Sequence, residues 1–240
     1  MLKQQLKADQ LKLSRTPFFL LHLVIPLLGL VIFISYQLMT QYPAEALTIN
    51  YYQLLTLIYP LIAAWMCTLI TDQEIEAGGG FFLLNTTSRS HTLASKLMVL
   101  IGSGLFACLL VVIGYHYIVS LLFVDYSLPL STCLLLALVI WGCALFQYSF
   151  HTWIGLRFGR NSSFAIAAVE LLLAALLLTG LGETIWFFFP CAWGIRLVPL
   201  VATSQSATKL GFAAVGIGTL LMLIFLFHWF QTWEGRKNED

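Results

Sequence analysis

The chain has 240 residues, of which 60% are hydrophobic and only 10% charged, and its formal net charge is +1. Soluble domains usually carry roughly a quarter charged residues, so this composition excludes an ordinary soluble domain. The basic residues form no stripe that could follow phosphates, which excludes nucleic acid as a partner.

Residues 1–16 form a polar and basic leader. Leucines alternate there with Lys3, Lys7 and Lys12, a pattern compatible with a short helix lying at the membrane surface. The alternative is a solvated leader whose charges only set topology. Pro17 makes a natural elbow before the first apolar run. That run is too long for the core of a cleavable signal peptide, so we expect it to remain as an anchor.

Six apolar stretches follow, each long enough to cross a bilayer core of roughly 30 Å at about 1.5 Å per helical residue. They are 17–39, 51–71, 97–123, 131–153, 163–182 and 208–230. Strand-like alternation is absent, and an open sheet could not satisfy its backbone in lipid. The sequence therefore predicts an all-α integral membrane domain over 17–230 and a polar tail over 231–240.

The basic residues predict the orientation, because lysine and arginine gather on the cytoplasmic side of membrane proteins. If the N-terminus is cytoplasmic, only Arg196 and Lys209 fall outside. The residues then inside are Lys3, Lys7, Lys12, Arg15, Arg89, Lys96, Arg157, Arg160, Arg236 and Lys237. This bias requires an even number of spans, so we expect six spans with both termini in the cytoplasm.

The three outer connections differ in character. Residues 41–50 and 124–130 are short, whereas 182–207 is too apolar for an ordinary loop and too broken by proline for a span. Such a composition is typical of re-entrant or interfacial half-helices. We predict that Pro190, Trp193 and Arg196 in this segment belong to a substrate path or a subunit interface; a seventh span is the alternative.

The most informative polar stretch lies between the second and third spans. Three acids precede a triple glycine, and four large apolar residues then face water, which is costly unless they pack against something. Residues 85–88 offer capping chemistry for the helix that leads into the third span.

This stretch resembles the coupling segment of ABC-2 type exporter permeases, in which an acidic stretch is followed by glycine, aromatic and leucine residues and then by an arginine and a lysine. The matching residues are Glu74, Glu76, Gly78, Phe81, Phe82, Leu83, Leu84, Arg89 and Lys96. The resemblance also covers the elbow, the six spans and the broken element. It implies that the segment inserts into a groove of a cytoplasmic ATPase. Two features depart from the family pattern: the triple glycine loosens the segment, and the proline often found before the arginine is missing.

Within that family, the small size of the chain makes it most similar to lantibiotic immunity permeases of the MutG, EpiG or SpaG kind, or of the MutE or EpiE kind. The resemblance implies a bacterial cytoplasmic membrane, a second permease subunit, two copies of an ABC ATPase and a peptide antibiotic as cargo. The chain lacks a GxxxxGK[ST] motif, so ATP and Mg²⁺ are expected on the partner and not here. A different amphipathic drug, peptide or lipid as cargo is the alternative.

Glu170 is the clearest ionisable group inside a predicted span, and no basic residue lies near it in sequence. It either lines the substrate path or bonds across an interface, or it is a protonated or hydrogen-bonded acid in helix packing. His22, His116, His151 and His228 are expected to be packing residues. The five cysteines show no metal-binding spacing, and HExxH is absent, so neither a metal site nor an intramembrane enzyme is predicted. A secondary transporter is the remaining alternative, although no internal repeat is evident.

Overall fold

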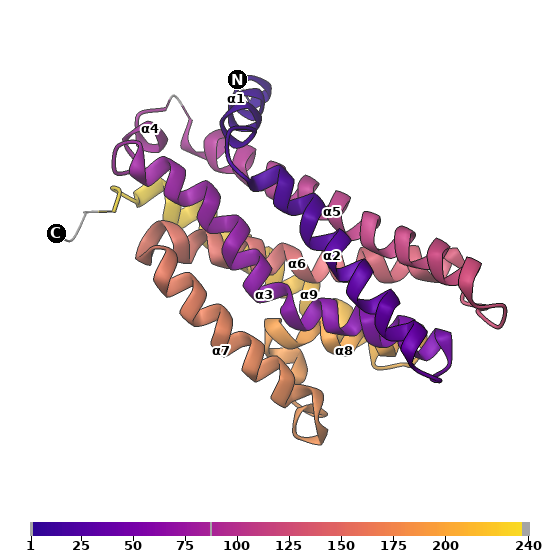
Figure 1. Cartoon of the computed structure of the whole chain (residues 1–240). Helices are drawn as coiled ribbons and strands as arrows, with labels where there is room; N and C mark the ends of the chain where they lie inside the picture. The colour runs from indigo at the N-terminus through magenta and orange to yellow at the C-terminus, as the bar shows by residue number, and fades with distance from the viewer. Residues whose placement is uncertain (1, 87, 237–240) are drawn as a thin grey trace.

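The computed structural model describes residues 2–86 and 88–236, and it describes the backbone but not the side chain of Phe82. Over these residues every regular element is a helix. Figure 1 shows the long helices packed side by side. They are α1 (Leu2–Leu13), α2 (Phe18–Met39), α3 (Ala44–Glu76), α4 (Phe81–Leu84), α5 (Arg89–Leu122), α6 (Leu130–Phe158), α7 (Arg160–Leu178), η1 (Gly180–Gly182), η2 (Trp186–Phe188), α8 (Pro190–Ala202) and α9 (Thr208–Thr232).

Six of these helices, α2, α3, α5, α6, α7 and α9, are long and apolar enough to cross a membrane. The prediction of six membrane helices is therefore confirmed. Several bounds differ from the predicted ones: α3 begins at Ala44, so the predicted outer connection 41–50 is largely helical, and α5 begins at Arg89. At about 1.5 Å per residue, α3 is about 50 Å long, so it extends beyond a hydrocarbon core of roughly 30 Å.

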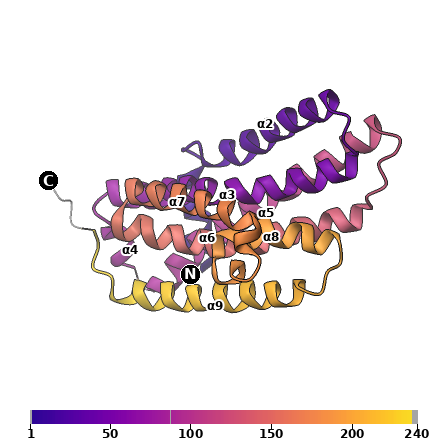
Figure 2. The ribbon, with the colours of Figure 1, turned by 90° about the horizontal axis from the view of Figure 1, so that it is seen from below.

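The bundle is built around α3 and α6, which pack against each other and against α8. Buried side chains form one core toward the end that carries α1 and α4, with Met66, Leu100 and Tyr148 among its members, and another around Tyr52 and Tyr115. Figure 2 shows α2 and α9 on opposite flanks. Along with α7, these two helices leave most of their apolar side chains uncovered, which is the arrangement expected when lipid covers the outside.

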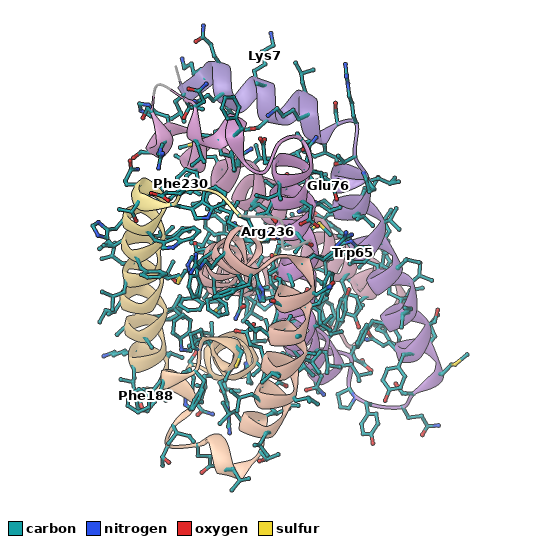
Figure 3. All side chains as sticks on the ribbon, turned by 90° about the vertical axis from the view of Figure 1, so that its left-hand side faces the viewer. Lys7, Trp65, Glu76, Phe188, Phe230 and Arg236 are labelled. Atoms are coloured by element: carbon teal, nitrogen blue, oxygen red, sulfur yellow. The ribbon has the colours of Figure 1, made fainter. Side chains whose placement is uncertain are left out.

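The two ends of the bundle differ in charge. One end carries α1 and α4 (Figure 1), together with the starts of α5 and α7 and the ends of α3, α6 and α9. Basic residues gather on these elements, whereas Arg196 lies at the other end of α7. Figure 3 shows Lys7 on α1 at the top and Phe188 in the lower part of that view.

The apolar segment before the last helix is broken, as predicted. It consists of two short 3-10 turns, η1 and η2, followed by α8, and Pro190 occupies the first turn of α8, where its missing N–H has no helical partner in any case. With 13 residues α8 is too short to span a bilayer. Its side chains Trp193, Ile195 and Leu197 are buried, so it is an internal part of the bundle.

Candidate functional site

The segment between α3 and α5 is an ordered turn carrying the one-turn helix α4. Gly78, Gly79 and Gly80 all have positive φ (148°, 62° and 88°), which only glycine adopts without strain. A Cβ on Gly80 would lie 2.9 Å from the ring of Trp233, just beyond α9. The expectation that the triple glycine loosens the segment therefore needs correcting, because the glycines form a tight turn that packs against the C-terminal segment.

The residues of α4 point in different directions. Leu83 is buried and Leu84 is half-buried, whereas Phe81 remains 58% exposed. Phe82 was predicted to share the exposed apolar surface, and its side chain lies outside the described residues. Leu83 thus anchors α4 to the bundle while Phe81 faces outward.

Glu74, predicted in the same acidic stretch, lies inside the protein. Its Oε1 accepts from Lys96 Nζ at 2.6 Å and from Lys12 Nζ at 2.8 Å, and Lys96 Nζ also contacts Asp9 Oδ1 at 3.0 Å. Ser95 Oγ donates to the other oxygen of Asp9 at 2.5 Å. We call Asp9, Lys12, Glu74, Ser95 and Lys96 the charged cluster. It joins α1, α3 and α5, and its two acids balance its two lysines.

We call the α3–α5 loop, the charged cluster and the helix ends around them the platform. Arg89 joins this platform to the end of α9. Its Nη1 donates to the carbonyl oxygens of Gln231 at 2.7 Å and Trp233 at 2.9 Å, at the end of α9. Carbonyls at a helix C-terminus lack intrahelical partners, so a guanidinium there satisfies them. Ser88, before α5, accepts from the backbone N–H of His91 at 3.4 Å, as its predicted capping role requires. The ends of α3 and α5 that flank the loop are therefore tied to α1 and α9.

Glu76 and Gly78 are exposed beside this platform. Figure 3 places Glu76 and Arg236 at the end of the molecule that faces the viewer, and both line a shallow hollow with Asp72 and Arg160. Arg160 Nε lies 3.3 Å from Asp72 Oδ2. Of the predicted coupling residues, Glu76, Gly78 and Phe81 face outward, while Glu74, Leu83 and Arg89 hold the platform together.

Glu170 lies within the bundle in a second polar site. Its Oε2 is 2.9 Å from His151 Nε2, and its Oε1 is 3.4 Å from Gln147 Nε2. His151 Nδ1 is in turn 2.9 Å from Ser163 Oγ. We call Gln147, His151, Ser163 and Glu170 the α6–α7 polar cluster. No basic residue lies near Glu170 in sequence, yet His151 reaches it because α6 and α7 are antiparallel neighbours joined at Gly159.

The other residues predicted for a substrate path have structural contacts. Trp193 Nε1 donates to the carbonyl of Phe187 at 2.8 Å, and its ring packs closely against Gly218 of α9. Arg196 Nε donates to Leu177 O at 2.8 Å, at the C-terminus of α7. Pro190 lines a small cavity with Gln147. The structure thus brings Pro190 near the α6–α7 polar cluster, whereas Trp193 and Arg196 brace neighbouring elements.

Gly80→Ala is expected to lower the free energy of unfolding by about 1–3 kcal/mol, because alanine resists positive φ and its Cβ would collide with Trp233. Gly102→Ala is the matched control, since a Cβ there meets nothing within 4 Å and favours the helix. A thiol-reactive dye can follow thermal unfolding, because all five cysteines are buried in the fold. Equal midpoints for the two variants would contradict the role of Gly80.

No family model, no curated protein and no solved structure matches this chain. The fold and the six apolar helices define the class by themselves: this is an all-helical, multi-pass membrane protein.

Proposed function

We propose that this protein is the membrane-spanning subunit of an ABC-2 type exporter whose ATPase is a separate chain. The observation that supports this most is the outward-facing Phe81 on a one-turn helix that contacts α3 and α5 and packs against the segment after α9. Such an element can transmit the movement of a bound partner to α3 and α5, and through their bonds to α1 and α9. The excess of basic residues at this end supports its placement on the cytoplasmic side of the membrane, which we take to be the bacterial cytoplasmic membrane.

The resemblance to lantibiotic immunity permeases supports a peptide antibiotic as cargo, with a second permease completing the transporter. In this proposal ATP binding closes the paired ATPase, α4 transmits the motion, and a peptide taken from the outer leaflet is released outward. Expression of the permease pair and the ATPase in a sensitive host tests the cargo. Tolerance should rise for at least one lantibiotic in a panel. Unchanged tolerance to every member would contradict the immunity role, and another amphipathic molecule would then be the cargo to test.

Replacing Phe81 and Phe82 together by alanine is expected to abolish co-purification of the ATPase without lowering the amount of inserted protein. The reason is that an exposed aromatic side chain such as Phe81, placed at the centre of a contact, carries much of the binding energy, and Phe82 belongs to the same predicted coupling segment. Phe188→Ala is the matched control, because Phe188 is 71% exposed at the opposite end of the molecule. Normal ATPase yield with the double variant would show that α4 is not the coupling element.

A secondary transporter is the second candidate, and the α6–α7 polar cluster is the observation that favours it. A glutamate 2.9 Å from a buried histidine can bind and release a proton within the bilayer. Proteoliposomes separate the two candidates: transport driven by a pH gradient without ATPase would support this candidate, and transport that requires ATP and the ATPase would support the exporter.

A further inference from the structure

An apolar cavity of about 70 Å³ lies between α2, α3, α5 and α6. Its walls include Pro26 from α2, Tyr59 and Met66 from α3, Cys108 from α5 and Ile140 from α6. A single water needs roughly 10–15 Å³ of such space, so the cavity is large enough for several methylene groups in a row. An apolar cavity of this size favours an alkyl group over water, which would find few polar partners along these walls.

His22 supplies an unpaired acceptor to this cavity. Its Nδ1 lies 2.8 Å from the carbonyl oxygen of Phe18, which can only accept, so Nδ1 carries the proton and Nε2 has the free lone pair. His22 is only 6% exposed, and within the described part of the chain no group donates to Nε2. A buried acceptor without a donor costs free energy, so this position calls for a donor from a ligand.

Pro26 removes the usual backbone donor at the same place. A helical carbonyl normally accepts from the N–H four residues later, and Pro26 has no N–H to give to the carbonyl of His22. The carbonyl of His22 therefore lacks its usual helical donor, and Nε2 of the same residue lacks a donor among the described residues, on a helix that lines the cavity. One O–H group placed here would satisfy an acceptor that the protein itself leaves open.

A larger hollow of about 480 Å³ lies on the outer side of His22, between α1, α2 and α5. Leu6 and Gln10 of α1 line it together with Phe19 and Phe106, and His22 lines both spaces. Figure 2 shows α2 running along the flank of the bundle, where most of its apolar side chains are uncovered. A molecule from the surrounding lipid can thus reach His22 from outside.

The position of His22 along the bundle suits the orientation of a lipid, whose polar end lies near the membrane surface. It lies in the second turn of α2, close to α1 and to the charged end of the bundle, while Val111 and Ile140 line the cavity further along their helices. An amphiphile with its polar end at His22 and its chain in the cavity would be oriented as lipids are in the nearest leaflet.

From these observations, we propose that this cavity binds a single-chain amphiphile whose polar end carries a hydroxyl hydrogen, donated to Nε2 of His22. A fatty alcohol, a monoacylglycerol and a protonated fatty acid share this chemistry. The site lies within one chain and needs neither a second permease nor an ATPase, so it stands or falls independently of the proposed exporter.

The test uses the full chain in phosphatidylcholine nanodiscs, whose lipid has no hydroxyl hydrogen, with dodecanol and dodecyl methyl ether as probes. Dodecanol should bind with a stoichiometry of one by native mass spectrometry and about tenfold more tightly than the ether, the value of one hydrogen bond. The ¹⁵N resonance of His22 Nε2 should move only with dodecanol. Equal affinity for the two probes, or an unmoved resonance, would overturn the proposal.

Two variants separate the hydrogen bond from the space. His22→Leu should bind both probes equally, because only the acceptor is lost, and Ala107→Trp should bind neither, because Ala107 lines the cavity and the indole would fill it. Dodecanol that keeps its tenfold preference in His22→Leu would overturn the assignment to Nε2. If His22→Leu does not fold, the comparison of the two probes in the native chain still decides.

Discussion

Replacing Lys96 by methionine is expected to lower the free energy of unfolding by about 3–5 kcal/mol, the usual cost of breaking a buried ion pair from one side. Lys96 is 6% exposed and bonds Asp9 and Glu74 at 3.0 Å and 2.6 Å. Methionine replaces the apolar stem of lysine without its charge, and it leaves two carboxylates in the charged cluster facing a single lysine. Reversible unfolding in mixed detergent, followed by the accessibility of the buried cysteines, gives the free energy.

The charge balance of the cluster makes a sharper control possible. Adding Asp9→Asn to Lys96→Met leaves one acid, Glu74, opposite one base, Lys12, at 2.8 Å. The double variant should therefore be more stable than Lys96→Met alone, although each change removes contacts. Lys7→Met on the exposed face of α1 should change stability by less than about 0.5 kcal/mol. A double variant no better than the single one would show that packing, and not charge, governs this site.

The charged cluster also links stability to the proposed coupling. Because α1 is held to α3 and α5 through Asp9, Lys12 and Lys96, a variant that breaks the cluster loosens the two helices that α4 contacts, α3 and α5. Lys96→Met should therefore reduce ATPase co-purification in the proposed exporter even though Lys96 itself is buried and touches no partner.

Hydrophobic length was sufficient to predict the six membrane helices, because each must supply about 20 apolar residues to cross the bilayer. Their ends were predicted less well. Ala44 to Asn50 and Arg89 to Lys96 are polar enough to be taken for connections, yet both are helical, since a helix continues beyond the lipid when a neighbouring helix covers it. Tertiary packing decided these boundaries.

The polar sites also divide into features that the sequence pattern predicts and features that depend on tertiary packing. Glu74 and Glu76 are two residues apart and looked equivalent in the acidic stretch, but this spacing puts them on different faces of α3, and only Glu74 is buried. The partner of Glu170 was missed because His151 lies 19 residues earlier. Gln147 and His151 are four apart on α6, so a shared polar face was visible in the sequence. The helix that it faces was not.

Replacing His151 by phenylalanine is expected to cost about 3 kcal/mol, because it leaves Glu170 without its nearest partner inside the bilayer. Adding Glu170→Leu should restore most of that loss, since removing both members of a buried polar pair is often close to neutral. The unfolding assay used for Lys96 measures both variants. If the double variant is as unstable as His151→Phe, the loss does not come from an unpaired Glu170, and the contact between the two residues does not stabilise the fold.

Glu170→Gln distinguishes the two candidate functions at the same site. The amide keeps a hydrogen bond with His151, so folding should change little, but it cannot bind and release a proton. An exporter driven by an ATPase should keep most of its transport rate with this variant, whereas a transporter driven by a proton gradient should lose nearly all of it. Because wild-type stability is retained, a loss of transport could not be attributed to unfolding; it would assign the α6–α7 polar cluster to proton coupling and argue against the exporter.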